Sequence, residues 1–582
     1  MRIIHFGKLV EDKAEKFTLK NCSVVIDGQH FFHNKYEHSR IPFVFGGDLD
    51  RYAAHVRNTV MGMFTKANVK CYIVFKGGDT DINQKIEKFG RFAFDAMENQ
   101  EFLQPILLRD VNQQIVDEME LKHTFCITES KNDCVALAMR LGCPVISRDI
   151  EFCFKAAPYI PETSLTFNST TNTIHCCRYT LQNFLQKFNL TENKMATFGV
   201  LSDTTKFPEL FFDKLLKSWD VPNKVKYVRH QQLILWLSKH GENDINLSIT
   251  TYLKNEDDRR KFRAVHTFIL QSMQNTQGGY ATEYMINSQL NIGVKDPDWF
   301  EKGVVCEHIP SMYVNLFKWQ VIQGSWFDRE DNNNNDSFLL SIDITKYAYN
   351  LLTNYKRSTL KLYHDSENYT EVDTLDPYVP RPSYECEESV FENGWKEIQN
   401  WNLFQHFLQH KGIRIELLSN IPEDCVLLII SLVYFGRRKT DVTKEIIAII
   451  MSYVLLSGER LTDTDLLAED LEQAKEAAYN YFKTNNDESR EIYDGQAMKN
   501  FDEFQFCLQQ MNNLNTLCGS PYRGSRYNGI YNGTFIYKFF RDLNRTTLSI
   551  DDFISDLLNN APSVLTFVNR LIQSYQEIMN NE

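Results

Sequence analysis

The stretch that decides the fold is CSVVIDG at residues 22–28, an apolar run that ends in an acid and a glycine. Three runs of the same kind follow it, KCYIVF at 70–75, TFCI at 124–127 and CPVI at 143–146. Short apolar runs of this type are typical of buried strands. Amphipathic helical patterns lie around these runs, at residues 50–67, 82–100, 109–121 and 133–141. The alternation predicts an α/β domain over residues 1–165, with a parallel sheet and crossover helices.

The remaining sequence is predicted to be mostly helical. We expect a helical extension of the first domain at residues 166–290 and an irregular region with loops at 291–394. A helical C-terminal domain is expected at 395–582, interrupted by a loop near 519–533. Within the irregular region, DREDNNNNDS at 328–337 predicts a surface loop, and the polar, proline-bearing stretch 363–388 predicts a linker or extended arm.

Composition limits the possible functions. A formal net charge of −13 argues against general affinity for nucleic acid. A protein with this net charge can still carry a local basic track. The longest apolar runs, at 425–435 and 446–456, are half the ~20 residues of a membrane span and predict buried helices instead. The opening residues MRIIHFGKLVEDKAEKF lack the apolar stretch of a secretory signal, and none of the thirteen cysteines forms a CxxC pair. We therefore expect an intracellular protein without a membrane partner.

Acidic side chains follow the predicted strands. In a parallel α/β sheet, ligands bind beyond the carboxyl ends of the strands, so the polar residues that follow them point towards a common site. The acids at or near these positions are Asp27, Glu129, Asp133, Asp149 and Glu151, and Asp203 stands where a later helix is expected to begin. Carboxylates that converge in this way repel one another unless a cation holds them. The pattern therefore predicts a Mg²⁺ or Mn²⁺ site that activates water for phosphodiester cleavage.

A structural role for each acid is the alternative. Acids that follow strands often cap the next helix, and Asp27 and Asp133 are suitably placed to do so. Taken singly, capping or solvation is the default role of such residues. Four of the acids fall on one predicted edge of the sheet, which favours a shared functional site.

The same residues resemble a known family. The segments VVIDGQHFFHNKY (24–36), FGGDLDRY (45–52), YIVFKGGD (72–79), PILLRDV (105–111) and ITESKNDCVALAMRLGCPVISRDIEFCF (127–154) resemble the asteroid family, a divergent branch of the flap-endonuclease/XPG nucleases. The resemblance covers most of residues 1–205. It implies a PIN-like fold that acts with Mg²⁺ or Mn²⁺ on single-stranded, overhanging or branched DNA, and a nuclear rather than cytoplasmic location. The metal and catalytic positions it implies are Asp27, Glu129, Asp149, Glu151 and Asp203, with Asp133 as a further metal ligand.

Several positions depart from the family pattern. Lys76-Gly77 stands where the family has Asp-Gly, the Asp-x-Asp pair is Asp149-Ile150-Glu151, and the glycine-rich helix–turn–helix that grips duplex DNA is absent from 204–220. An ammonium at Lys76 could neutralise nearby carboxylates as a metal would. Its side chain could equally point outward into solvent. If it neutralises them, we expect Mg²⁺ or Mn²⁺ to bind weakly or not at all.

A faint basic track accompanies the acids. Lys85, Lys88 and Arg91 are spaced for one face of the predicted helix at 82–100, in the region that flap endonucleases use as an arch over single-stranded DNA. A solvated helix face is the alternative explanation. Two functional hypotheses follow. The chain is either a metal-dependent, structure-specific DNA endonuclease, or a catalytically inactive PIN-like binding protein whose helical C-terminal region engages a protein partner.

Overall fold

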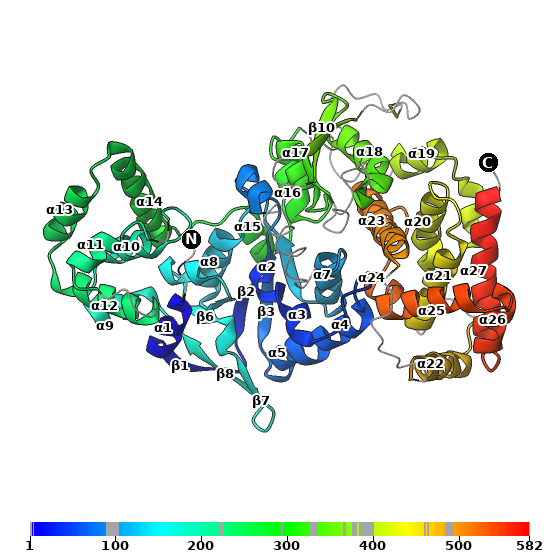
Figure 1. Cartoon of the computed structure of the whole chain (residues 1–582), viewed down its shortest axis with the longest axis horizontal. Coiled ribbons are helices and arrows are strands. Elements are labelled where there is room, and N and C mark those ends of the chain that lie inside the picture. The colour runs from blue at the N-terminus through cyan, green and yellow to red at the C-terminus, as the bar shows by residue number, and fades with distance from the viewer. Residues whose placement is uncertain are drawn as a thin grey trace. The chain divides into compact units, whose positions relative to one another are not determined.

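The computed structural model of the chain separates into two compact units, each built from stretches that are distant in sequence (Figure 1). The first unit comprises Met1–Lys35, Asn58–Lys76 and Glu120–Leu290. The second comprises Tyr36–Arg57, Gly77–Met119 and Asn291–Glu582. The described residues are 3, 5–88, 104–208, 210–221, 226–293, 295–324, 336–364, 368–374, 381–382, 391, 398, 401–458, 461, 465–483 and 494–580. The division at residues 165, 290 and 394 expected from the sequence stays a prediction.

A five-stranded parallel sheet forms the centre of the first unit. Its order is β4-β3-β2-β5-β6, and the strands are β2 (Ser23–Asp27), β3 (Lys70–Phe75), β4 (Lys122–Phe125), β5 (Val145–Ser147) and β6 (Tyr159–Pro161). Strand β2 is central, and Val25 lies opposite Tyr72 of β3 on one side and Val145 of β5 on the other. All four predicted strands are therefore confirmed. The ends of β2 and β5 come side by side at the carboxyl edge of the sheet.

The apolar run that opened the sequence argument is fully buried. Val24, Val25 and Ile26 have no exposed surface, as expected for a strand covered on both faces. Directly after β2, Gly28 begins the short helix α2 (Gly28–Phe32), which packs against β3. A Cβ atom at Gly28 would lie 2.6 Å from the ring of Phe75, so only glycine allows this close approach of helix and sheet.

The predicted helices are present with different boundaries. The stretch at 50–67 forms three pieces, α4 (Leu49–His55), a π-helical segment (Val56–Val60) and α5 (Gly62–Lys66). Residues 82–88 are helical, and the remainder of the helix predicted at 82–100 lies outside the described residues. Helix α7 (Leu108–Glu118) begins and ends earlier than predicted, and α8 (Lys131–Leu141) begins two residues earlier. Helices α4 and α7 belong to the second unit, whereas α8 packs against β2 and β5 in the first.

Beyond the parallel sheet, the first unit contains a second sheet and a set of helices. Strands β1 (Glu15–Leu19), β8 (Thr173–Arg178) and β7 (Thr166–Asn168) form an antiparallel sheet in that order. The remaining helices of this unit are α1 (Phe6–Lys13), η2 (Ile150–Phe154), η3 (Glu162–Ser164), α9 (Leu181–Phe188), α10 (Glu192–Ser202), α11 (Asp213–Ser218), α12 (Lys226–Lys239), α13 (Glu242–Tyr252), α14 (Glu256–Gln274) and α15 (Tyr280–Asn287). Of the stretch 166–290 predicted to be helical, the part from Leu181 to Asn287 contains α9 to α15, whereas β7 and β8 occupy its beginning.

The second unit is mostly helical. Besides α4 and α7 it contains α3 (Lys35–Ser39), which starts at the last residue of the first unit's opening stretch. Its other helices are α16 (Trp299–Val305), α17 (Tyr313–Trp319), η4 (Ser337–Ser341), α18 (Ile342–Thr353), α19 (Leu403–His410), η7 (Ile415–Asn420), η8 (Glu423–Cys425), α20 (Val426–Gly436), α21 (Thr443–Ser457), α22 (Ala468–Lys483), α23 (Gly495–Leu517), α24 (Tyr527–Ile530), α25 (Gly533–Arg545), α26 (Ile550–Leu557) and α27 (Pro562–Asn580).

Two loop predictions for the second unit need correction. The stretch 363–388 is not a linker throughout, because β10 (Thr359–Tyr363) and β11 (Tyr369–Asp373) form an antiparallel hairpin that β9 (Val321–Gln323) extends. The rings of Tyr363 and Tyr369 lie 5.1 Å apart across this hairpin and help to fix its register. Residues 519–533 include the short helix α24, so they are only partly a loop. Of the loop predicted at 328–337, residues 328–335 lie outside the described part of the chain.

The two longest apolar runs are buried, as predicted. Every residue of α20 is buried, and in α21 residues 446–455 are buried while Leu456 is partly exposed. Helix α20 packs against α23 and α27, and α21 packs against α24 and α25. Within the described residues, none of the helices combines the length and the apolar character that a membrane span requires.

Candidate acidic site at the carboxyl edge of the sheet

Asp27 is the most buried of the predicted acids. It ends β2 and has no exposed surface. One carboxylate oxygen accepts a hydrogen bond from Ser130 Oγ at 3.0 Å, and the other accepts one from Ser147 Oγ at 2.8 Å. That second oxygen also lies 2.7 Å from His30 Nδ1. Both oxygens of this carboxylate are therefore engaged by side chains of the protein.

His30 connects Asp27 to a second acid. It lies one helical turn after Asp27, and its Nε2 is 3.7 Å from Asp149 Oδ2. Burial would lower the pKa of His30, but the hydrogen bond and charge of Asp27 and the charge of Asp149 raise it above its usual value. The ring is a cationic bridge between these two carboxylates when it is protonated.

Lys131 contacts two acids of the site at once. Its ammonium lies 2.9 Å from Asp149 Oδ2 and 2.7 Å from Glu151 Oε2. The lysine side chain is 16% exposed, and the two acids are 12% and 10% exposed. Burial would lower the pKa of Lys131, but Asp149 and Glu151 raise it above its usual value. The ammonium of Lys131 is therefore a positive charge held between two carboxylates.

The pKa values of the two acids are shifted downward, which favours their charged forms. Burial would raise the pKa values of Asp149 and Glu151, but the ammonium of Lys131 holds both below their usual values. Asp149 is placed by its own turn as well, because its Oδ1 accepts the backbone N–H of Glu151 at 2.9 Å. Its backbone N–H donates to Ser147 Oγ at 3.0 Å. The position of the Asp149 carboxylate is thus set by the backbone that leaves β5, whereas the Glu151 carboxylate is held by Lys131.

Glu129 forms an ion pair with Lys76, which is the predicted arrangement in which this lysine neutralises a nearby carboxylate. Lys76 Nζ lies 2.8 Å from Glu129 Oε1, and the side chains are 21% and 39% exposed. The outward-pointing alternative is wrong. Glu129 also precedes α8, whereas Asp133 lies in its first turn, so the four-residue spacing of these two acids does not place them on one helical face.

Asp133 has a structural partner in the described residues. Its Oδ1 accepts hydrogen bonds from the backbone N–H groups of Gly279 and Thr282, at 2.8 and 3.0 Å, and from Thr282 Oγ1 at 2.6 Å. It therefore holds the first turn of α15, a capping role supplied from another element. Its predicted role as a metal ligand stays a prediction.

Asp203 does not begin a helix. It follows the last residue of α10, and its Oδ1 accepts hydrogen bonds from the backbone N–H and the hydroxyl of Thr205, at 2.9 and 2.8 Å. This is the turn-closing geometry that aspartate adopts after helices and in loops. The expectation of a new helix at this point is therefore wrong, and its membership of the acidic site stays a prediction.

The predicted basic track lies in the second unit. Lys85 and Lys88 belong to the helical residues 82–88, where the ammonium of Lys88 is 3.4 Å from Gln84 Oε1, and Arg91 lies outside the described residues.

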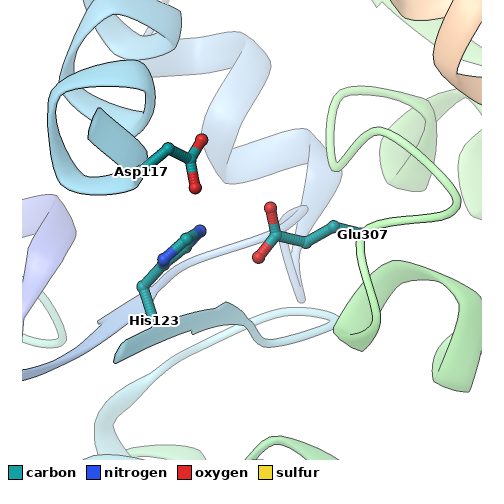
Figure 2. Close-up of side chains that lie close together, drawn as sticks. All are labelled: Asp117, His123 and Glu307. Atoms are coloured by element: carbon teal, nitrogen blue, oxygen red, sulfur yellow. The ribbon is translucent and has the colours of Figure 1, made fainter. Parts of the chain in front are cut away.

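Figure 2 shows three other side chains, Asp117, His123 and Glu307. Asp117 and Glu307 belong to the second unit and His123 to the first, so no metal site is assigned to them.

The acidic site as arranged does not fit a divalent cation. Mg²⁺ and Mn²⁺ need carboxylate oxygens that can face the ion, and they bind poorly beside fixed positive charge. Here the ammonium of Lys131 lies between Asp149 and Glu151, and His30 and the two serines engage Asp27. The sequence argument missed Lys131, Ser130 and Ser147. The only local signal for Lys131 was a lysine two residues after Glu129, and its role depended on where the following helix begins.

The parallel sheet, its strand order and the acids at its carboxyl edge define a PIN-like domain of the flap-endonuclease type. The family model of the Asteroid N-terminal domain matches residues 439–582. The human protein named Single-strand DNA endonuclease ASTE1 is 25% identical over 324 residues, which are 50% of this chain and 47% of that protein. Protein asteroid of Drosophila melanogaster is 26% identical over 166 residues, 27% of this chain and 19% of that protein. The chain is thus similar, over parts of its length, to proteins of the asteroid family.

The chain spans about half the length of the human relative that it matches. Among solved structures, the catalytic core of Rad2 in complex with DNA substrate is similar with a TM-score of 0.29 and 12% identity, covering 50% of this chain and 95% of that one. Flap endonuclease-1 from Methanococcus jannaschii has a TM-score of 0.25 and 14% identity, covering 46% and 99%. The fold assignment rests on the strand order and register given above.

Proposed function

We propose that this chain is a nuclease-derived protein that binds single-stranded or branched DNA and does not hydrolyse it with a resident divalent metal. The names of its relatives support a nuclease-like role. The observation that carries the proposal is the ion-pair network in which Lys131 joins Asp149 to Glu151. A metal-dependent hydrolase needs these oxygens for its ion, whereas a binding protein does not.

The cations of this edge reduce its repulsion of a phosphate backbone. Asp27, Glu129, Asp149 and Glu151 would together carry four negative charges, which would repel DNA. Lys76, Lys131 and protonated His30 return three positive charges to the same edge. Repulsion from DNA phosphates is therefore largely removed without Mg²⁺. Lys85, Lys88 and Arg91 are further cations that the sequence offers for contact with DNA.

DNA binding and cleavage by the purified full chain test the proposal. Fluorescence anisotropy would compare single-stranded, overhang, flap and blunt duplex DNA, each in EDTA and in MgCl₂ or MnCl₂. We expect tighter binding to the first three than to the blunt duplex, with dissociation constants that EDTA does not change. We expect no cleavage in parallel gel assays, in which the human relative serves as the active reference. Absence of DNA binding, or Mg²⁺-dependent cleavage that Asp27→Asn abolishes, would overturn the proposal.

A metal-dependent endonuclease is the second candidate, because Asp27, Asp149 and Glu151 do meet at one edge of the sheet through shared partners. In that case the ion would have to displace Lys131 from its two carboxylates. Cleavage would then need high Mn²⁺ or Mg²⁺ concentrations. A protein partner of residues 395–582 also remains a proposal, and co-purification with the full chain would identify one.

A further inference from the structure

We propose that Lys131 is a built-in replacement for a divalent cation, and that Lys131→Glu converts this edge of the sheet into a Mn²⁺- and Mg²⁺-binding site. The inference builds on the proposed function, since it treats the acidic edge as one that no longer uses metal. It goes further in assigning the loss of metal binding to a single side chain. It also assigns the residues that a restored ion would contact.

The geometry at Lys131 is that of a bridging cation. One ammonium contacts a carboxylate oxygen of Asp149 and one of Glu151, at 2.9 and 2.7 Å. Asp149 is held independently of the lysine, because its backbone N–H donates to Ser147 Oγ and its Oδ1 accepts the backbone N–H of Glu151. The backbone of Glu151 is placed by the same turn after β5. Removal of the ammonium would therefore leave the fixed carboxylate of Asp149 beside that of Glu151, two residues further along the same turn.

The other cations of this edge do not occupy such a position. Lys76 contacts Glu129, and both side chains of that pair are more exposed than those around Lys131. Lys155 donates to the amide oxygen of Asn132 at 3.1 Å. His30 approaches Asp149 only to 3.7 Å and is bonded mainly to Asp27. Among the described cations of this edge, Lys131 has the shortest contacts to two acids.

The backbone places residue 131 correctly for a ligand. It is the first residue of α8, directly after Ser130, whose hydroxyl donates to Asp27. A glutamate side chain at this position would replace the positive charge with a carboxylate directed towards Asp149 and Glu151. Three carboxylates and water are sufficient oxygen ligands for Mg²⁺ or Mn²⁺. Without an ion, the three negative charges would repel one another.

The test uses the full chain and three variants. Lys131→Glu creates the expected site, and Lys131→Gln removes the charge without adding a carboxylate. Arg229→Glu is the matched control, since Arg229 pairs with Asp213 at 2.8 Å with side chains 15% and 13% exposed. Mn²⁺ binding would be followed by electron paramagnetic resonance of the free ion and by the thermal unfolding midpoint at constant ionic strength.

We expect Lys131→Glu to unfold at a lower temperature than the natural protein in EDTA and to be stabilised by Mn²⁺. Its Mn²⁺ affinity should exceed that of the natural protein by about a hundredfold, because one ligand is gained and one repulsive charge is lost. Lys131→Gln should show a smaller gain. Arg229→Glu should lose thermal stability without any response to Mn²⁺.

Equal Mn²⁺ affinity of the natural protein and Lys131→Glu would overturn the inference, as would a folded Lys131→Glu that does not respond. If Lys131→Glu does not fold in EDTA, refolding in Mn²⁺ and the affinity of Lys131→Gln decide the question. Failure of the proposed function appears elsewhere, in DNA binding or cleavage by the natural protein. If the natural protein fails to bind DNA but Lys131→Glu binds Mn²⁺, the proposed function is refuted and the inference about Lys131 is supported.

Discussion

Replacement of Asp27 by alanine decides whether this acid is a structural anchor or a retained catalytic group. In a metal-dependent site, a buried carboxylate is held for its ion and its removal commonly stabilises the fold without metal. In this chain, Asp27 has no exposed surface and already has Ser130, Ser147 and His30 as partners. We therefore expect Asp27→Ala to be destabilising.

The magnitude follows from those three contacts. A hydrogen bond to a charged acceptor contributes about 1.5–3 kcal/mol, and Ser130, Ser147 and His30 would each lose one, about 4.5–9 kcal/mol in all. Removal of the buried carboxylate also relieves a desolvation cost of several kcal/mol, which offsets a large part of that loss. The net expectation is a decrease in the free energy of unfolding of about 2–4 kcal/mol. Glu129→Gln is the matched control, because its pair with Lys76 is half-exposed and should contribute only about 0–1 kcal/mol.

The assay is urea unfolding of the full chain combined with amide hydrogen exchange. Exchange in peptides from β2 and α8 reports the first unit separately from the second. Faster exchange in these peptides for Asp27→Ala, and little change for Glu129→Gln, would agree with the structural role. A variant that is as stable as the natural protein in EDTA, or more stable, would refute the reasoning and favour a retained metal site.

Three further predictions concern single side chains. Gly28→Ala should lower the free energy of unfolding by about 1–3 kcal/mol in urea titrations, because the new methyl group would lie 2.6 Å from the ring of Phe75. Burial raises the pKa of Asp50 from 3.8 to about 6. The contribution of its protonated form to the stability of the folded state is therefore complete below pH 3.8 and is lost as the pH rises through 6. Asp50→Asn should remove this pH dependence from the thermal unfolding midpoint measured between pH 4 and 7. Lys76→Asp should increase Mn²⁺ affinity less than Lys131→Glu does, because the ion pair of Lys76 with Glu129 is more exposed than that of Lys131 with its two acids. An equal increase for both variants in a Mn²⁺ titration would contradict that ranking.

The sequence predicted the centre of the sheet well, for a local reason. The runs at 22–26 and 70–75 match β2 and β3 within one residue, because continuous apolar runs bounded by polar residues are a strong strand signal. Strand β4 begins two residues earlier than predicted. The sheet β1-β8-β7 was not predicted, because Phe17 pairs with Cys176, about 160 positions later, and such pairing leaves no local pattern.

The candidate site was predicted less completely than the sheet. Following each strand to its end located Asp27, Asp149 and Glu151, but it could not identify the cation between two of them. That cation depends on where α8 begins, and helix boundaries are weakly encoded in sequence. With the helix predicted to start at residue 133, Lys131 belonged to a loop. In the structure it is the first residue of the helix and faces two acids.

The division of the chain into interleaved stretches has a consequence for synthesis and for dissection. The polypeptide passes from one unit to the other after residues 35, 57, 76, 119 and 290. The first unit therefore lacks its last helices until residue 290 has been made, and by then two stretches of the second unit have already emerged without the largest part of that unit. Those stretches, Tyr36–Arg57 and Gly77–Met119, must wait for sequence beyond residue 291. A fragment that ends at residue 165 would contain both stretches and would lack α9 to α15, so neither unit can be isolated by cutting the chain once.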